Sequence, residues 1–382
     1  MNDLFLFFRY NSHMKKYCLL IVVVLLFTKS YSQDNNLNLI IGTYTTSCAS
    51  KGIYVYNFNT QTADFSLKAT SENVINPSYV SVSKDQKFVY SVNEYGDKSS
   101  VSAFGFNPES GALKFLNQQN SEGADPCYII NDEKNVIVAT YSGGTISVFG
   151  KNADGSIAKN KQVITHAVEK TNSVEQVKAH VHMVQFSPDG KYLFATDLGT
   201  DYLYVYNYNP EAKSGVLDIK YLIKVKVGSG PRHLTFSQDG KYVYLIQELS
   251  GNVTVFEYND GNLNFIQETS VISKKFKGKT SAADIHISPN GKFVYATNRG
   301  KANDITCFEI RKNGKLKKKT STSTLGKGPR NFAIDPSGNF LLVAHQYTNN
   351  VVIFKMDKET GALTATGKEI ALCAPVCLVF AQ

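Results

Sequence analysis

Four side chains with complementary acid, base and cationic chemistry lie at the ends of predicted strands in the central part of the chain: His182, Arg232, Glu248 and Arg299. A histidine and a glutamate can exchange protons near neutral pH when their surroundings shift their pKa values. A guanidinium group offers a fixed fork of donors that suits a carboxylate, a phosphate or a developing oxyanion. These residue types predict general acid and base chemistry on a substrate that carries or develops negative charge.

The elements that must position these residues come from a repeat that returns seven times, with its clearest copies at 186–197 and 236–248. Each copy has an alternating apolar run, a tight turn such as Pro-Asp-Gly and a second alternating run, and two further runs follow. The copies begin between 46 and 55 residues apart, at Pro77, Pro126, Val181, Pro231, Ala282, Pro329 and Pro375. This period predicts an all-β fold, a seven-bladed β-propeller with four antiparallel strands per blade.

The two ends of the repeat region are complementary. Residues 37–43 resemble a second strand without a first, and residues 375–380 resemble a first strand with nothing after it. We therefore expect the C-terminal strand to complete the first blade and close the ring, which leaves no unpaired edge. The absence of Trp argues against the WD40 class.

The start of the first strand and the end of the second strand of every blade should meet at one mouth of the central channel. Aligned copies place these residues on the first strands: Ser78, Cys127, His182, Arg232, Ala283, Arg330 and Val376. The residues on the second strands are Tyr44, Glu94, Tyr141, Leu198, Glu248, Arg299 and Gln346. Positions where a repeat breaks its own rule are expected to be functional. We predict His182, Arg232, Glu248 and Arg299 as catalytic residues. The predicted substrate-binding residues are Tyr44, Glu94, Tyr141, Arg330 and Gln346.

Each predicted catalytic residue has a structural alternative. Arg232 and Glu248 could form only a structural ion pair, because such pairs also perturb pKa values without doing chemistry. His182 could be a hydrogen-bonded rim residue, and Arg299 could belong to a surface loop. Four such residues on three consecutive blades at one mouth favour a shared site.

The sequence lacks the motifs of several other catalytic mechanisms. The chain has no Gly-x-Ser-x-Gly, no His-Glu-x-x-His and no phosphate-binding glycine loop followed by Lys-Ser or Lys-Thr. We expect no metal and no cofactor. Five cysteines follow residue 32, and an odd number leaves at least one unpaired; Cys373 and Cys377 lack the spacing of a zinc site. Spacing alone assigns no disulfide.

The amino end predicts export. Basic residues at 15–16 precede an apolar stretch at 17–27 and small residues at 30–32, so we interpret 14–32 as a signal peptide and 1–13 as a possible upstream extension. The apolar stretch is short for a bilayer, although a retained anchor is the alternative. The remainder, 33–382, is the predicted propeller domain of a periplasmic or secreted protein, with no stable membrane insertion after cleavage.

The formal net charge of +9 is spread along the chain. Its one cluster, which lies at a predicted turn, consists of Lys312, Lys315, Lys317, Lys318 and Lys319. We interpret this cluster as a solvated turn and expect no nucleic-acid partner.

Several segments resemble the lactonase family of seven-bladed propellers, the 6-phosphogluconolactonase and 3-carboxymuconate cyclase type. They include Ile-Gly-Thr-Tyr-Thr at 41–45, Ala-His-Val-His at 179–182, Gly-Pro-Arg-His-Leu at 230–234, Gln-Glu-Leu-Ser at 247–250 and Thr-Asn-Arg-Gly at 297–300. The resemblance implies an enzyme that acts on small lactones, anionic or sugar-derived, without a metal, with His182, Arg232, Glu248 and Arg299 at the positions of the family's site. The chain departs from the family at Ala179, where Pro is usual, and at His345, where Asn is expected.

For lactone hydrolysis, Glu248 or His182 would be the general base and the other would donate the proton, while Arg232 and Arg299 would bind the oxyanion or an anionic substituent. Two alternatives remain. The first is a muconate-type cycloisomerase that uses the same groups on a diacid. The second is a non-catalytic exported propeller that binds a partner.

Overall fold

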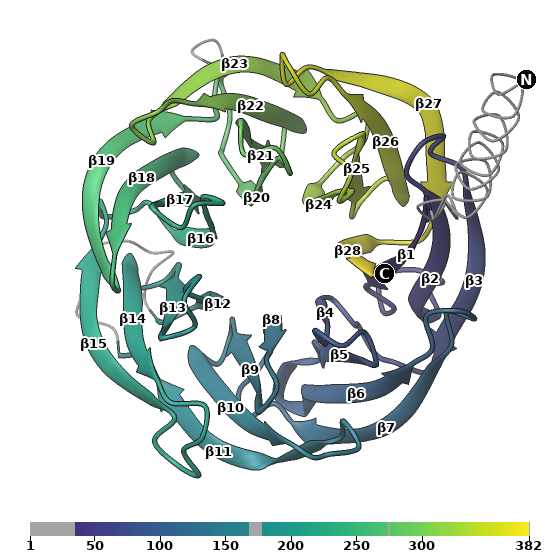
Figure 1. The fold of residues 1–382 in the computed structure, drawn as a ribbon, viewed down its shortest axis with the longest axis vertical. Helices are drawn as coiled ribbons and strands as arrows, with labels where there is room; N and C mark the ends of the chain where they lie inside the picture. The colour runs from purple at the N-terminus through teal and green to yellow at the C-terminus, as the bar shows by residue number, and fades with distance from the viewer. Residues whose placement is uncertain (1–34, 168–177, 274–275, 382) are drawn as a thin grey trace, which may run out of the picture. The chain divides into compact units, whose positions relative to one another are not determined.

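The computed structural model describes residues 35–167, 178–273 and 276–381. From residue 36 onward these form one compact unit, a ring of seven four-stranded antiparallel sheets (Figure 1). The predicted fold class is therefore confirmed. The interpretation of 14–32 as a signal peptide and of 1–13 as an extension falls outside the described residues. Within the described part of the chain, no helix is long and apolar enough to cross a membrane.

Within each blade the strands run in order from the channel outward. Blade 1 is β28 (Pro375–Ala381), β1 (Asn36–Thr43), β2 (Gly52–Asn59) and β3 (Phe65–Glu72). Blade 2 is β4 (Val80–Val82), β5 (Phe88–Asn93), β6 (Ser100–Phe106) and β7 (Leu113–Asn120), with the short 3-10 helix η1 (Gly96–Lys98) between β5 and β6. Blade 3 is β8 (Pro126–Asn131), β9 (Asn135–Thr140), β10 (Thr145–Lys151) and β11 (Ile157–Thr165). Blade 4 is β12 (Val181–Phe186), β13 (Tyr192–Asp197), β14 (Tyr202–Tyr208) and β15 (Leu217–Lys224).

The remaining blades follow the same order. Blade 5 is β16 (Pro231–Phe236), β17 (Tyr242–Gln247), β18 (Asn252–Asn259) and β19 (Asn262–Ser270). Blade 6 is β20 (Ala282–Ile287), β21 (Phe293–Asn298), β22 (Asp304–Ile310) and β23 (Leu316–Ser323). Blade 7 is β24 (Pro329–Ile334), β25 (Phe340–His345), β26 (Asn350–Met356) and β27 (Leu363–Ala371).

The hairpin between the first and second strands of a blade is built by the repeated turn. In blade 4, the Ser187 hydroxyl donates to the Asp189 carboxylate at 2.5 Å and accepts from the Tyr192 amide at 3.0 Å. Gly190 adopts φ 69°, a left-handed conformation that glycine tolerates. Blade 5 repeats this arrangement with Ser237 and Asp239. The turn chemistry thus fixes which end of each blade is the closed end of this hairpin.

The core lies between neighbouring blades. The second and third strands are almost wholly buried, whereas the fourth strands alternate between exposed and partly buried residues. The largest apolar cluster spans blades 3, 4 and 5, with Phe194 and Tyr206 among its buried members. Since adjacent blades pack face to face, each blade holds the next in place.

Ring closure occurs inside blade 1. Strand β28 pairs antiparallel with β1, for example Ile40 with Val379, so the last strand of the chain lies beside the first (Figure 1). This pairing removes the edge that either strand would otherwise expose. The predicted closure is confirmed.

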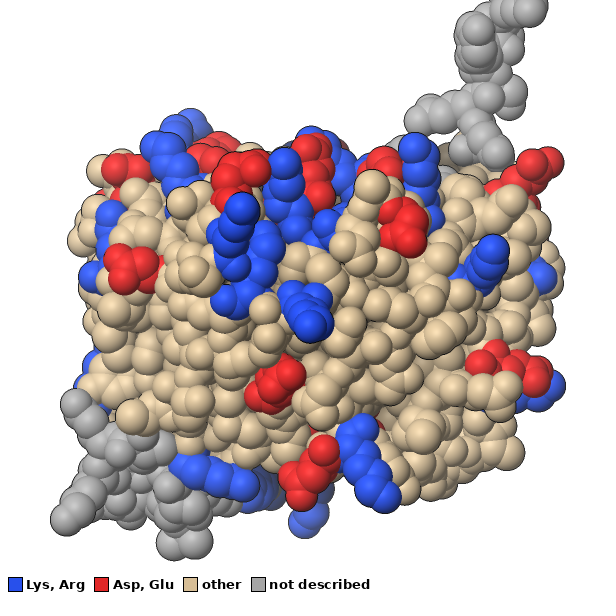
Figure 2. Space-filling model, turned by 90° about the horizontal axis from the view of Figure 1, so that it is seen from below, with Lys and Arg blue, Asp and Glu red and all other residues tan. Residues whose placement is uncertain are grey.

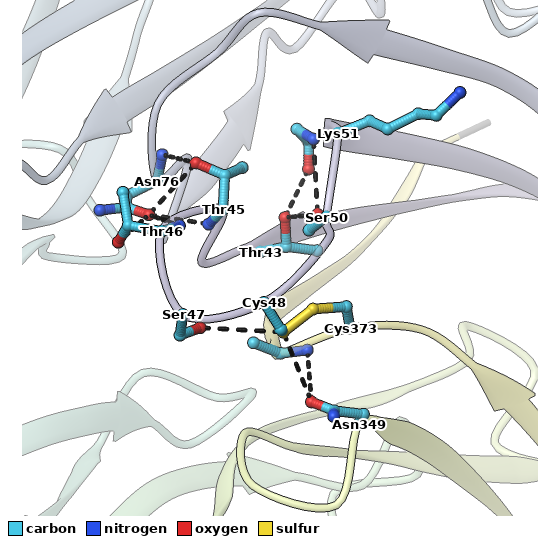
Figure 3. The surroundings of a disulfide bond; sticks show 12 residues. Thr43, Thr45, Thr46, Ser47, Cys48, Ser50, Lys51, Asn76, Asn349 and Cys373 are labelled. Carbon is cyan, nitrogen blue, oxygen red and sulfur yellow. Dashed lines mark hydrogen bonds between the residues drawn. A yellow bond between two sulfur atoms is a disulfide. The ribbon is translucent and has the colours of Figure 1, made fainter.

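A disulfide that the sequence analysis did not assign reinforces this closure. Cys48, in the loop after β1, is bonded to Cys373, in the connection that enters β28; their Cα atoms are 6.1 Å apart across 325 residues of sequence (Figure 3). On the other side of the same loop, the Asn76 side-chain oxygen accepts from the amides of Thr45 and Thr46 at 2.7 and 3.0 Å. The three other cysteines of the described residues, Cys127, Cys307 and Cys377, are free and buried.

Charged side chains are distributed unevenly over the ring. In the edge-on view of Figure 2, Lys, Arg, Asp and Glu crowd along one rim with both signs interspersed, and the wall between the rims is mostly uncharged. Within the lysine cluster, Lys319 pairs with Glu309 at 3.6 Å and Lys318 donates to the Val271 carbonyl at 2.7 Å. Both lysines are therefore already paired within the ring.

We predict that replacing Cys48 and Cys373 together by Ser lowers the free energy of unfolding by about 2 to 4 kcal/mol, because the cross-link no longer restricts the unfolded chain. Equilibrium denaturation of the oxidised parent and the double variant measures this difference. A reducing agent should lower the parent to the level of the variant and leave the variant unchanged. Equal midpoints for the two oxidised proteins would contradict the prediction.

Candidate functional site

The seven residues predicted at the second-strand ends occupy equivalent places. Each directly follows the second strand of its blade, and its backbone amide donates to a carbonyl at or before the start of the neighbouring first strand. The seven bonds are Tyr44 to Ala374, Glu94 to Asn76, Tyr141 to Asp125, Leu198 to His180, Glu248 to Gly230, Arg299 to Ser281 and Gln346 to Gly328, at 2.7 to 3.1 Å. Since the bond uses only the backbone, the side chain at each position can differ.

Five of the seven residues predicted on the first strands are the extra residues of β-bulges. In blade 5, Pro231 pairs with Gln247 and His233 pairs with Ile246, so Arg232 has no partner on β17. The same register shift leaves His182, Arg330, Cys127 and Val376 unpaired in their blades. A bulge bends the strand and re-aims its side chains.

Because of the bulges, consecutive residues of several first strands reach one small cavity in the channel. Its lining is Ser78, Tyr79, Cys127, His182, Arg232, His233, Arg330, Asn331 and Val376. The sequence analysis predicted His182, Arg232 and Arg330 for the site, but it missed Tyr79, His233 and Asn331. Strict alternation along a strand would have turned the residue after each predicted position away from the channel.

The centre of the site is an ion triad formed by Arg232, Glu248 and Arg299. Glu248 Oε2 accepts from Arg232 Nε at 3.0 Å and pairs with Arg299 Nη2 at 2.8 Å. The side chains are 2% exposed for Arg232, 10% for Arg299 and 19% for Glu248. Both cations engage the same carboxylate oxygen, so Oε1 is the oxygen of Glu248 that can meet a ligand.

Glu248 and Arg232 are both charged at neutral pH. Burial by itself would raise the pKa of the Glu248 carboxyl, but Arg299, Arg232 and Arg330 outweigh burial and hold that pKa below its ordinary value. Burial and the neighbouring Arg299 lower the pKa of the Arg232 guanidinium to about 10, which still leaves it protonated. Glu248 is therefore an anion held between two cations.

His182 is a neutral imidazole beside this triad. Burial, Arg232 and His233 lower the pKa of His182 well below its ordinary value. Its Nδ1 lies 3.9 Å from the Cys127 sulfur, and its ring packs edge to face with Tyr141 at 5.5 Å between centroids. Cys127 is a buried neutral thiol, because burial raises its pKa.

The predicted substrate-binding residues form a second group around the mouth. The Tyr44 hydroxyl donates to Glu94 Oε2 at 2.8 Å, and the Arg330 guanidinium carbon lies 5.6 Å from the centre of the Tyr44 ring. Tyr141 stacks on His180 at 4.3 Å. The buried side-chain oxygen of Gln346 has no hydrogen-bond partner among the described residues.

Although burial opposes it, Tyr44, Glu94 and Glu248 raise the pKa of Arg330, so two carboxylates act on its charge from a distance. The guanidinium of Arg330 forms no ion pair within the described chain, whereas those of Arg232 and Arg299 both pair with Glu248. Arg330 lines the same cavity as His182. The arrangement therefore offers an anion-binding group next to a carboxylate, a neutral imidazole and two cations.

Across residues 35–167, 178–273 and 276–381, no three His, Cys, Asp or Glu side chains are grouped as ligands of a metal ion. The polar groups at the mouth include three guanidinium groups, those of Arg232, Arg299 and Arg330, and guanidinium groups recognise anions.

Comparison with known proteins shows the family to which the chain belongs. The family described as lactonase, 7-bladed beta-propeller, matches residues 38–380, and the chain belongs to this family. A curated relative from Formosa agariphila, named 6-phosphogluconolactonase, is 40% identical over 87% of this chain and 96% of its own.

Two solved structures are similar to this chain in both fold and sequence. A Bacteroides fragilis protein described as a candidate 6-phosphogluconolactonase is 44% identical, with a TM-score of 0.88 over 93% of this chain and 100% of its own. The periplasmic gluconolactonase of Pseudomonas aeruginosa is 35% identical, with a TM-score of 0.87 over 91% of this chain and 99% of its own.

We predict that Glu248→Gln lowers the free energy of unfolding at pH 7 by on the order of 3 kcal/mol, because it leaves two largely buried guanidinium groups without their anion. The folded pKa of Glu248 is below the ordinary value of 4.5, so its stabilisation is complete above that value and is lost as the pH falls through the folded pKa. Urea denaturation should show a difference between parent and variant that shrinks below about pH 4.5. The control is Glu268→Gln on exposed β19, where only a side-chain hydrogen bond to Asn252 is affected. A Glu248→Gln difference that persists unchanged at acidic pH would contradict this account.

Proposed function

We propose that the protein is a hydrolase that opens a sugar-derived lactone at the mouth of the propeller channel, by general acid and base catalysis without a metal. The observation that carries the proposal is the anionic Glu248 held between Arg232 and Arg299 beside the neutral His182. The names of the relatives, a 6-phosphogluconolactonase and a periplasmic gluconolactonase, support a lactone as substrate.

In this proposal Glu248 is the general base. Water attacks the lactone carbonyl carbon while one of its protons passes to Glu248 Oε1, and the carbonyl oxygen becomes an oxyanion bound by Arg232 and Arg299. When the ring C–O bond breaks, the carbonyl re-forms and the leaving alkoxide takes the proton from Glu248. The products are the hydroxy acid and the regenerated carboxylate, so one residue serves as base and then as acid.

Charge balance favours Glu248 over His182 as the base. Protonation of Glu248 removes a negative charge from the two guanidinium groups at the moment when the oxyanion provides another, so the net charge of the site does not change. Protonation of His182 would instead place a cation near Arg232, Arg330 and His233, the groups that already depress its pKa. We assign His182 the role of orienting the water or the substrate through its ring N–H.

The position of Arg330 favours a substrate that carries an anionic substituent. Its guanidinium lacks a carboxylate partner in the described chain and faces the cavity that His182 also lines. A phosphate or carboxylate would complete the fork of donors. Tyr44, Glu94, Tyr141 and Gln346 would contact the rest of the substrate.

We also propose that the protein is exported, with 14–32 as its signal peptide and 33–382 as the mature propeller. The disulfide between Cys48 and Cys373 supports export, since disulfides persist in oxidising compartments. A relative of known structure is described as periplasmic.

We predict that Glu248→Gln lowers kcat on sugar lactones by about 10² to 10⁴, because the amide cannot accept the water proton. His182→Gln should have a smaller effect, and Glu268→Gln on the outer wall should behave like the parent. Continuous titration of released acid by the folded variants measures all three rates. If His182→Gln is inactive and Glu248→Gln retains the parent rate, the base is misassigned. Product analysis with a muconate-type diacid tests the cycloisomerase alternative.

We predict that Arg330→Met raises KM for a lactone that carries a phosphate or carboxylate by about tenfold or more, because a charge-assisted hydrogen bond is lost. KM for the matched neutral lactone should change little. A panel of phosphorylated and unphosphorylated sugar lactones gives both constants. Equal effects on charged and neutral lactones would show that Arg330 does not bind the anionic group.

A further inference from the structure

A buried carboxylate behind the site connects three blades. Asp284, on β20 of blade 6, is 1% exposed. Its Oδ1 accepts from His233 Nδ1 at 2.8 Å and from the Ile285 amide at 3.0 Å. Its Oδ2 accepts from His286 Nε2 at 2.9 Å, from the Asn331 side-chain amide at 2.6 Å and from the Phe332 amide at 3.2 Å. Asp284 therefore links β16, β20 and β24, the first strands of blades 5, 6 and 7.

The bond from Asp284 selects the tautomer of His233. Because Nδ1 carries the proton that points to the carboxylate, Nε2 is left as an acceptor in the neutral ring. Burial and the adjacent Arg232 lower the pKa of His233 to about 4, so the ring stays neutral at physiological pH. A neutral ring with a free lone pair can contact a cation without repelling it.

The cation that contacts the His233 ring is the guanidinium of Arg232. Its Nη1 lies 3.3 Å from Nε2 and 3.5 Å from Nδ1 of His233, over the face of the ring. The same Nη1 donates to the Ala283 carbonyl, while Nε donates to Glu248. The guanidinium thus has His233, a backbone carbonyl and the base on separate sides. Arg232 is 2% exposed, so these neighbours fix where it lies. The contacts run without a break from Asp284 through His233 and Arg232 to Glu248.

We propose that Asp284 and His233 are a positioning pair for Arg232: Asp284 fixes the orientation of the neutral His233 ring, and the face of that ring packs against the guanidinium and aims Arg232 at the oxyanion of the reaction. The pair acts on the reaction through Arg232. This inference rests on the proposed lactone hydrolysis for its kinetic consequence, but the tautomer and the arginine contact can be measured without a substrate.

Two substitutions at the same position separate the two contacts of His233. In His233→Asn, the amide can replace Nδ1 and still donate to Asp284, but nothing reaches Arg232. In His233→Gln, the longer side chain places its amide near the position of Nε2, where its oxygen can accept from Arg232, and the bond to Asp284 is lost. If positioning of Arg232 is what matters, His233→Gln retains more activity than His233→Asn.

We expect His233→Asn to lower kcat by about 10 to 100-fold with little change in KM, because a small displacement of a catalytic group costs about this much. His233→Gln should recover at least part of the loss. In an Arg232→Ala background, His233→Asn should have no further effect on kcat, since the group that it positions is gone. The matched control is His286→Gln, which also changes a bond to Asp284 but has no contact with Arg232; it should keep the parent kcat.

Two spectroscopic readouts do not depend on turnover. In 15N spectra of histidine-labelled protein, His233 should show the Nδ1-protonated tautomer in the parent, and Asp284→Leu, which offers no acceptor, should abolish that preference. The Arg232 Nη–H signals, which report the contact at Nη1, should be protected from exchange in the parent and in His233→Gln, and less protected in His233→Asn.

The proposal is overturned if His233→Asn is as active as His233→Gln, if the effects of His233→Asn and Arg232→Ala on kcat multiply independently, or if His233 is not protonated on Nδ1. If the parent itself turns over no lactone while the tautomer and the arginine signal are as expected, the proposed function fails and the positioning pair stands.

Discussion

The pairing of β28 with β1 is the constraint on which the rest of the structure depends. Each blade packs against two neighbours, so the ring exists only when the last blade meets the first, and the chain achieves this by placing its final strand on the inner side of its first one. With the ring closed, the seven first strands surround a common channel (Figure 1). Residues from blades 3, 4, 5 and 7, distant in sequence, then line one cavity. The disulfide holds the same junction, and Tyr44 at the mouth begins the loop that contains Cys48.

The features that all blades share and the side chains that differ between blades have different roles. The hairpin turns, the interblade core and the backbone bond after each second strand are repeated and specify the scaffold. The side chains at the bulges and strand ends differ between blades. The ion triad depends on this difference between blades. Glu248 and Arg232 come from blade 5, and Arg299 comes from blade 6. Because the scaffold carries the stability, the mouth can hold buried charges that a core would not tolerate.

Much of the fold could be predicted because the period of the repeat and its Asp-Gly turns are local signals. The strand-end positions of Glu248 and Arg299 followed from the same alignment, and the structure brings them to Arg232 and His182. Their roles in catalysis remain predictions. His233, Asn331 and Tyr79 were missed because a β-bulge has no reliable sequence signature, and alternation turned these residues away from the channel. The Gly-Pro-Arg-His segment carried a signal, since two polar residues in succession at a strand start are unusual for a regular buried strand. The link between Cys48 and Cys373 could not be predicted, since spacing does not specify which cysteines pair.

The backbone bond that fixes each strand-end residue has a consequence for how such proteins diversify. The amide of Glu248 and the amide of Leu198 make the same contact although their side chains have nothing in common. A point mutation at any of these positions therefore changes the chemistry of the mouth without disturbing the attachment of the residue that carries it. The ring keeps the backbone attachment of each position constant while the side chains vary, so selection for a new small molecule acts on the side chains and on the pairs that they form, such as Glu248 with Arg299.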